Sequence, residues 1–197
     1  HNIMIQVYKR LKKMREKYVD TLAKLYEYAT TVYSKRTYTQ WYDTKEGSYT
    51  YASFKSECDS LSKKLTQYGI GSGDKVAILS QSMPNWSVAF FATVAHGRIS
   101  IPILPDSSEN EVTNIINHSE SKVIFVSKRL AGKIAPEVMD KMTLVIELDT
   151  FEVLKADDEK FTCDGRTSIP TPDDIATIIY TSGTTGSAKG VVLSHRN

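Results

Sequence analysis

The feature that most constrains the fold is an alternation of short apolar runs with helical patterns between residues 75 and 180. Neighbouring parallel strands need a crossover connection, which is usually a helix. The alternation therefore predicts an α/β fold with a mainly parallel sheet and helices on both faces. The runs of strand length lie at 75–79, 99–104, 122–126, 144–148 and 175–180.

Two segments between these runs carry clear helix signals. Pro84 and Asn85 open a segment that is apolar on all sides and ends at Gly97, so we expect this helix inside the protein. Ser108 and Glu111 form a capping box at the start of another helix.

The chain before the alternation predicts two helices joined by a β-hairpin. Residues 37–51 contain two aromatic and β-branched runs around a turn at Lys45, Glu46 and Gly47. A helix follows, with Thr50 or Ser53 as its N-cap and Gly69 at its end. Its predicted buried stripe consists of Phe54, Cys58, Leu61, Leu65 and Tyr68.

The first 35 residues are interpreted as an amphipathic helical segment. Its predicted buried face is Tyr8, Leu11, Tyr18, Leu22, Leu25 and Ala29. Between residues 9 and 17 a single acid, Glu16, is accompanied by six basic residues, namely Lys9, Arg10, Lys12, Lys13, Arg15 and Lys17. This pattern is compatible with peripheral contact with anionic lipid, although a solvated helix face is the simpler interpretation.

Composition excludes several classes of protein. Lys plus Arg number 25 and Asp plus Glu number 23, so the charge is too balanced to demand nucleic acid as a partner. Cys58 and Cys163 lack metal-ligand spacing and are expected to be free thiols. No run is apolar enough for a membrane span or a signal peptide, which predicts a cytoplasmic location.

The richest chemical signal is the segment Thr181 to Gly190, which directly follows the last apolar run. Strand ends in such sheets are where ligands gather. Glycines let a backbone adopt positive φ and approach an anion, hydroxyls donate hydrogen bonds, and one lysine supplies a mobile positive charge. The segment therefore predicts a polyphosphate-binding loop, made by Thr181, Ser182, Gly183, Thr184, Thr185, Gly186, Lys189 and Gly190.

Its spacing does not fit the two most common nucleotide loops. Counted from Gly183, a P-loop would need a glycine at Ala188 and a hydroxyl at Gly190. The Rossmann pattern also fails, because Gly183 and Gly186 lack the closely spaced first glycine. A flexible linker would not explain the apolar runs on both sides of the loop.

The stretch "IIYTSGTTGSAKGVVLSHRN" resembles the phosphate-binding signature of the adenylate-forming enzymes, which include acyl-CoA synthetases, peptide-synthetase activating modules and luciferases. Ala188 replaces the family's usual proline, a change that leaves every proposed phosphate donor in place. "SYTYASF" and residues 73–127 are also similar to the family, and the order of motifs looks most like the long-chain fatty-acid branch.

The resemblance implies an acid–thiol ligase that uses ATP to convert a fatty acid to an acyl-adenylate and then to an acyl-CoA thioester. It implies that Thr181, Ser182, Thr184, Thr185 and Lys189 hold the β- and γ-phosphates. It also implies Mg²⁺, with Thr181 or Thr184 as a candidate hydroxyl ligand, and coenzyme A as co-substrate. An amino-acid- or aryl-acid-activating enzyme and a non-catalytic α/β binding domain remain alternatives.

The family's catalytic residues lie beyond Asn197, so the resemblance assigns none here. We therefore expect residues 36–197 to be part of a large N-terminal AMP-binding domain, in a fragment that is inactive alone. Among other candidates, His195 and His96 are interpreted as structural. Trp86, Phe90 and Phe91 are interpreted as core residues in preference to an acyl tunnel.

Overall fold

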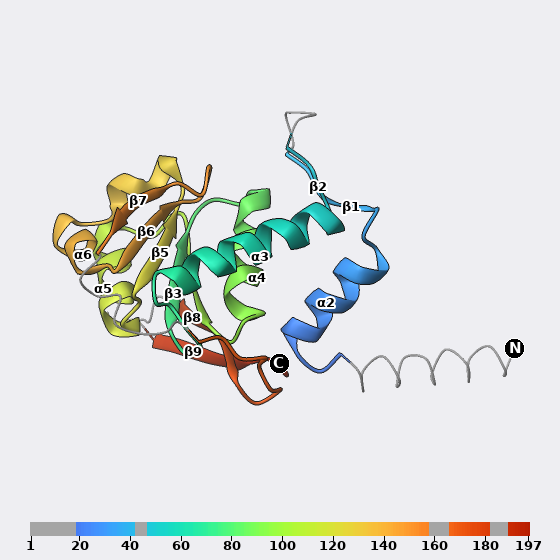
Figure 1. Cartoon of the computed structure of the whole chain (residues 1–197). Helices are drawn as coiled ribbons and strands as arrows, with labels where there is room; N and C mark the ends of the chain where they lie inside the picture. Colours follow the sequence, from blue (N-terminus) through green and yellow to red (C-terminus); the bar gives the residue numbers. More distant parts are fainter. Residues whose placement is uncertain (1–18, 42–46, 158–165, 182–188) are drawn as a thin grey trace, which may run out of the picture.

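The computed structural model describes residues 19–41, 47–157, 166–181 and 189–197 of the chain. Its centre is a seven-stranded sheet in the order β7-β6-β5-β3-β4-β8-β9 (Figure 1). All neighbours are parallel except β7 beside β6 and β9 beside β8. The mainly parallel α/β architecture predicted from the sequence is therefore confirmed. The strands are β3 (Lys75–Leu79), β4 (Ile99–Ile103), β5 (Val123–Val126), β6 (Leu144–Glu147), β7 (Val153–Ala156), β8 (Ile175–Thr181) and β9 (Lys189–Ser194).

Helices cover both faces of this sheet, as the parallel crossovers require. Val76 and Ile78 of β3 contribute to the core on the side of α3 and α4, whereas Ala77 and Leu79 contribute to the core on the side of α5 and α6. Both side-chain sets of one strand are thus buried. Figure 1 shows these helix pairs on opposite sides of the sheet. The helices are α3 (Tyr51–Gln67), α4 (Pro84–Val94), α5 (Glu109–Ser119), α6 (Pro136–Lys141) and the short 3-10 helix η1 (Lys128–Lys133).

The predicted helix caps are present. Thr50 is the N-cap of α3 and forms a capping box with Ser53, and Ser108 forms the predicted box with Glu111 at α5. Gly69 follows α3 with φ of +71°, the left-handed conformation that favours glycine after a helix. The sequence therefore located these helix boundaries by their local chemistry.

The hairpin before α3 is also confirmed. β1 (Thr37–Thr39) pairs antiparallel with β2 (Tyr49–Thr50), while the predicted turn residues Lys45 and Glu46 lie outside the described part of the chain. The hairpin is fastened to the main body through Asn85, whose side-chain oxygen accepts a 2.9 Å hydrogen bond from the Tyr49 hydroxyl. The Asn85 amide donates in turn to the carbonyls of Leu148 and Asp149.

The predicted buried face of the first helical segment is wrong where the structure describes it. In α2 (Leu22–Val32) the buried residues are Tyr26 and Thr30, whereas Leu25 is 44% exposed and Ala29 only half-buried. The Tyr26 ring stacks on Phe91 and packs edge-on against Phe54, so this aromatic contact sets the orientation of the helix. The predicted positions Tyr8, Leu11 and Tyr18, and the basic residues between 9 and 17, lie outside the described residues.

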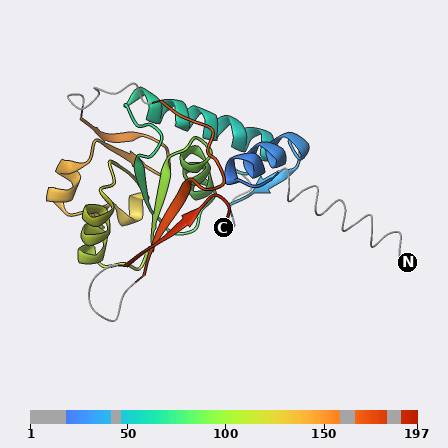
Figure 2. The same cartoon turned by 90° about the horizontal axis from the view of Figure 1, so that it is seen from below.

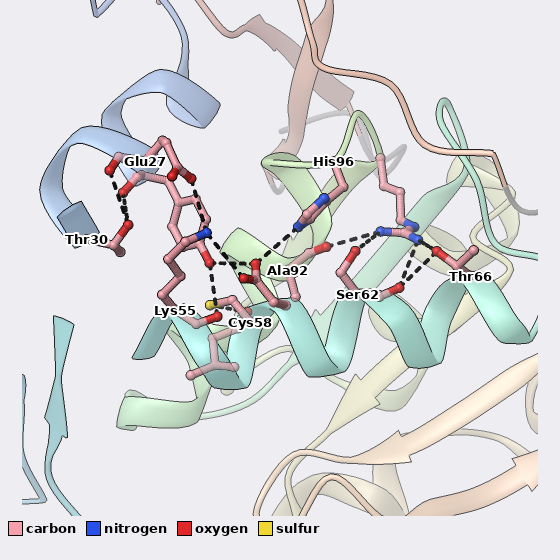
Figure 3. Close-up of polar contacts among 12 residues, drawn as sticks. Glu27, Thr30, Lys55, Cys58, Ser62, Thr66, Ala92 and His96 are labelled. Carbon is pink, nitrogen blue, oxygen red and sulfur yellow. Dashed lines mark hydrogen bonds and ion pairs between the residues drawn. The ribbon is translucent and has the colours of Figure 1, made fainter. Parts of the chain in front are cut away.

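The layer formed by α3 and α4 is joined by a buried arginine that no motif indicated. Arg98 has no exposed surface, and burial lowers the pKa of its guanidinium to about 10, so it stays charged at neutral pH. The guanidinium donates to the carbonyls of Ile70, Ala92 and Ser62 and to the hydroxyls of Ser62 and Thr66. Figure 3 shows Ser62, Thr66 and Ala92 converging from the two helices.

Candidate functional site: the loop end of the β8–β9 hairpin

The candidate site is built on the hairpin of β8 and β9. β8 lies parallel to β4, and the Thr177 hydroxyl donates a 2.9 Å hydrogen bond to the Ser100 carbonyl, which fastens the strand to the sheet. β9 then returns antiparallel along β8 with Thr181 opposite Lys189. In Figure 2 the two red strands lie side by side and run to one end of the molecule. The hairpin thus carries the predicted loop to the carboxyl end of a parallel strand.

The structure describes three of the eight predicted phosphate-binding residues. Thr181 and Lys189 are exposed and face each other across the two strands, and Gly190 follows Lys189. Among the described residues, no hydrogen bond or ion pair engages the Thr181 hydroxyl or the Lys189 ammonium group. The other five lie outside the described residues, namely Ser182, Gly183, Thr184, Thr185 and Gly186. The hydroxyl and the ammonium group are thus presented together at the mouth of the loop.

Gly190 has a reason for being glycine that differs from the one expected. It lies in β9 and is not among the described glycines with positive φ. A Cβ at this position would stand 2.9 Å from Cγ2 of Ile178 and 3.3 Å from the Tyr180 ring. Gly190 therefore lets the two strands keep their large apolar neighbours on one face.

Tyr180 anchors the end of β8 to α5. Its hydroxyl lies 2.8 Å from Nδ1 of His118, and the two rings meet edge to face. Burial raises the pKa of the Tyr180 hydroxyl, which keeps it protonated and able to serve as a hydrogen-bond donor. Because 62 positions separate the two residues in sequence, no local pattern could have indicated the contact.

At the end of the hairpin away from the loop, hydrogen bonds join the residue before β8 to the residue after β9. The His195 amide donates to the Asp174 carbonyl, and the Asp174 carboxylate accepts a 2.7 Å hydrogen bond from the Thr171 amide. His195 is buried, and desolvation lowers the pKa of its imidazole. Neither ring nitrogen has a hydrogen-bond partner among the described residues. Its burial agrees with the structural interpretation, although the orphaned nitrogens were not foreseen.

His96 lies in a polar seam between α2, α3 and α4. Its Nε2 is 4.0 Å from the Asp59 carboxylate, which also accepts from Lys55 and from the Tyr26 hydroxyl. Burial lowers the pKa of His96, and nearby Arg98 adds to the effect. Figure 3 shows Lys55, Cys58 and His96 along this seam. The free thiol of Cys58 is buried there, whereas Cys163 lies outside the described residues.

The aromatic residues of α4, which were interpreted as core residues, are half-buried and pack against the core from its margin. Phe90 stacks on Trp86 with centroids 5.3 Å apart, and both pack against the core on the α3 side together with Phe91. Trp86 also lines a surface cavity of about 890 Å³ between the β1–β2 hairpin and the start of α4, together with Tyr38, Trp41 and several hydroxyl side chains. No group of three or more metal-ligating side chains occurs within the ranges that the structure describes.

No helix among the described residues is long and apolar enough to cross a membrane. Of the two candidate metal ligands, Thr181 and Thr184, the structure describes only Thr181, and a single hydroxyl does not define a metal site. The described part of the site is therefore a hydroxyl and an ammonium group on neighbouring strands of the β8–β9 hairpin. Such a pair is suited to an anion with several oxygens.

Comparison with known proteins identifies the family of the chain. Residues 26–197 match the model of a family described as AMP-binding enzyme. The chain is 28% identical over 175 residues to Fatty acyl-CoA synthetase A of Dictyostelium discoideum, a match that covers 79% of this chain and 26% of that protein. It is 32% identical over 167 residues to FR901469 synthetase of Dothideomycetidae sp. (strain 11243), covering 85% of this chain and 1% of the synthetase.

Among solved structures, the fatty acyl-adenylate ligase of L. pneumophila in complex with acyl adenylate and pyrophosphate matches with a TM-score of 0.71 at 22% identity, which shows a shared fold. The match covers 89% of this chain and 30% of the ligase. The chain spans about a quarter of the length of Fatty acyl-CoA synthetase A. Since the family model covers most of the chain, the protein belongs to the AMP-binding enzyme family.

Proposed function

We propose that the full-length protein is an acid–thiol ligase that activates a fatty acid with ATP and transfers the acyl group to coenzyme A. A fatty-acid carboxylate attacks the α-phosphorus, pyrophosphate leaves, and an acyl-adenylate is formed. The coenzyme A thiol then attacks the acyl carbonyl, and AMP leaves as the thioester forms. The single observation that carries this proposal is the pairing of exposed Thr181 and Lys189 at the mouth of the hairpin in a chain of this family.

The chain's own contribution is to hold and neutralise the phosphate chain. Carboxylate and triphosphate repel each other, so the protein must offset charge on the departing pyrophosphate while holding the reacting atoms in line. Lys189 supplies the positive charge, and Thr181, Ser182, Thr184 and Thr185 supply hydroxyl donors to the β- and γ-phosphates. Gly183 and Gly186 let backbone amides approach the same oxygens.

The hairpin limits the reorganisation that this binding requires. Tyr180 is held by His118, and Gly190 fits beneath the Tyr180 ring, so the strands that carry Thr181 and Lys189 keep a fixed register. Donors that are positioned in advance stabilise developing charge more effectively than donors that must reorganise. A Mg²⁺ ion, when bound, would neutralise phosphate charge, and Thr181 or Thr184 would be the candidate hydroxyl ligand from this chain.

Fatty acids are the favoured substrate class because the chain is similar along most of its length to a fatty acyl-CoA synthetase and shares its fold with a fatty acyl-adenylate ligase. Similarity to 4-coumarate–CoA ligase 2 of Oryza sativa subsp. japonica, at 29% identity over 168 residues, keeps an aryl-acid- or amino-acid-activating enzyme as the second candidate.

The two candidates separate in a pyrophosphate-exchange assay on the full-length protein. Palmitate, 4-coumarate and a mixture of amino acids are supplied in turn with ATP and Mg²⁺, and incorporation of labelled pyrophosphate into ATP is measured. We expect exchange with palmitate and a loss of about tenfold or more in Lys189→Ala. The exposed Lys141 serves as the matched control, and Lys141→Ala should keep full exchange.

Exchange that depends on 4-coumarate or on amino acids, but not on palmitate, would replace the fatty-acid assignment with the second candidate. Exchange with none of the three acids would favour a non-catalytic binding domain and contradict the ligase proposal.

A further inference from the structure

The loop end of the β8–β9 hairpin extends beyond the backbone pairing that joins the hairpin to the rest of the sheet. Among the described residues, β8 pairs with β4 at one position, where Thr177 lies opposite Ser100. From Ile178 to Thr181, β8 pairs with β9 alone. A two-stranded ribbon is marginally stable by itself. The placement of Thr181 and Lys189 therefore depends on contacts from outside the ribbon.

Tyr180 provides such a contact between the ribbon and α5. Its hydroxyl lies 2.8 Å from Nδ1 of His118, and its ring is buried. Within the described ranges this is the one side-chain hydrogen bond that links residues 178–181 to a helix. The same ring covers Gly190 of β9, where an added Cβ would lie 3.3 Å from it. The ring therefore touches both strands and is held by one residue of α5.

The helix α5 is a firm support for this contact. A capping box of Ser108 and Glu111 fixes its start, and Ile115 and Ile116 bury it against the sheet. His118 lies in its last turn and is exposed. In Figure 2, α5 lies beside the loop end of the red hairpin. A residue at this point of α5 can hold the hairpin without being part of the core.

His118 reaches the candidate site through Tyr180. Successive residues of a strand point to opposite faces of the sheet. Tyr180 packs into the core beside α5, so the side chain of Thr181, the next residue, points to the other face. Lys189 lies opposite Thr181 in the register, and Gly190 lies opposite Tyr180. The imidazole and the phosphate-binding side chains are therefore on different faces of the same two strands.

We propose that His118 is a positioning residue for the phosphate-binding loop, which holds Tyr180 over Gly190 and thereby holds Thr181 and Lys189 in place for a phosphate chain. The inference rests on the proposed function of the hairpin. The Tyr180 hydroxyl can donate to a neutral imidazole and accept from a protonated one, so the contact persists in both forms of His118. Without it, the ribbon has to be ordered when the ligand binds, and this ordering lowers affinity.

The test is titration calorimetry of inorganic pyrophosphate with the full-length protein and its variants. His118→Leu removes one hydrogen bond at an exposed position and should weaken binding by about three- to tenfold. His118→Asn should restore most of the affinity, because its side-chain oxygen can accept a hydrogen bond from the Tyr180 hydroxyl. Asn117→Leu is the matched control, since Asn117 is an exposed neighbour on α5, and it should bind like the parent protein.

A second pair of variants tests whether the effect passes through Tyr180. Tyr180→Phe keeps the ring over Gly190 and removes only the hydroxyl, so it should weaken binding by the same factor as His118→Leu. The double variant should show no further loss, because both changes remove the same interaction. Amide hydrogen exchange without ligand should be faster at Thr181 and Lys189 in His118→Leu than in the parent protein. Circular dichroism of each variant confirms that it is folded.

The outcomes separate this inference from the function on which it rests. Parent-like binding by folded His118→Leu, together with weak binding by Lys189→Ala, would overturn the positioning role and leave the phosphate site in place. Equal losses in His118→Leu and His118→Asn would also overturn it, because the hydrogen bond to Tyr180 would then not be the cause. Parent-like binding by Lys189→Ala would contradict the proposed function itself, and the positioning role would fail with it.

Discussion

The layer of α3 and α4 covers one face of the sheet, whereas β8 and β9 form one edge of it, and the side chains of the two regions differ sharply in burial. In the helical layer even a guanidinium is buried, and Arg98 satisfies carbonyls and hydroxyls of two helices at once. In the hairpin, Ile179, Val191 and Val192 remain 40–53% exposed, and Thr181 and Lys189 point to the surface. In the helical layer the buried guanidinium has hydrogen-bond partners within the protein. In the hairpin, the Thr181 hydroxyl and the Lys189 ammonium group have no partner among the described residues.

The difference shows where stability and binding chemistry reside. Buried polar groups must be hydrogen-bonded, and a network that achieves this holds its elements in a single arrangement. Groups meant for a ligand have to be left unpaired until the ligand arrives. Changes in the helical layer should therefore affect folding, whereas changes at the mouth of the hairpin should affect binding.

The largest effect is expected from Arg98→Met. The substitution keeps the apolar stem but removes all hydrogen bonds to Ile70, Ala92, Ser62 and Thr66. Because buried carbonyls would lose their donor, we expect the free energy of unfolding to fall by about 3–5 kcal/mol. Urea unfolding followed by circular dichroism measures it.

Arg196 provides the matched control, since its side chain is 62% exposed and pairs with an 83% exposed Asp173. Arg196→Met should change the free energy of unfolding by less than about 1 kcal/mol. Equal effects of the two substitutions would mean that the buried network does not hold the helical layer together.

A smaller effect is expected from Gly190→Ala in the hairpin. The new Cβ would meet Ile178 at 2.9 Å and the Tyr180 ring at 3.3 Å. We expect a loss of about 1–3 kcal/mol through overpacking, with faster amide hydrogen exchange in β8 and β9.

Gly132→Ala is the control, because nothing lies within 4 Å of a Cβ at that position and its φ is not positive. It should leave stability unchanged or raise it by roughly 0.4–1 kcal/mol. Unchanged thermal stability in Gly190→Ala would show that the contacts beneath Tyr180 do not fix the hairpin.

The smallest expected effect is on the pH dependence of the free energy of unfolding, and it involves one histidine from each region. Desolvation lowers the pKa of both His96, in the polar seam, and His195, at the base of the hairpin. The unfolded chain then binds more protons than the folded one below the ordinary histidine pKa of 6.5. Stability should therefore be complete above that pH and fall as pH drops through the folded pKa values.

His96→Asn and His195→Asn should each flatten this dependence, by less than about 1.4 kcal/mol for each unit of pKa shift removed. Urea titrations between about pH 5 and 8 measure the slope. A slope that is unchanged in both variants would assign the dependence to other groups.

Much of the architecture was predictable because its signals are local. Apolar runs located the five parallel strands, and Thr50, Ser108 and Gly69 marked helix ends through capping chemistry. The edge strands β7 and β9 were missed as strands, because β9 contains Gly190 and neither strand alternates between buried and exposed residues. The face of α2 was wrong since aromatic contacts of Tyr26 with α3 and α4, which are distant in sequence, decide it.

The candidate site was also predictable only where its signals are local in the sequence. Composition and position pointed to Thr181, Lys189 and Gly190, but only coordinates show that the first two face each other and that Gly190 is required by packing. The contact between His118 and Tyr180 joins residues 62 positions apart. The burial of Arg98 depends on two helix ends that meet only in the folded chain.

The most direct test of the central claim is pyrophosphate binding by this chain and by Lys189→Ala, measured by titration calorimetry, with thermal unfolding recorded on the same samples. If the mouth of the hairpin holds a phosphate chain, the substitution should weaken binding by about tenfold or more, because a charge-assisted contact is lost. The unfolding temperature should stay unchanged, since Lys189 is exposed. Parent-like affinity in the folded variant would contradict the account.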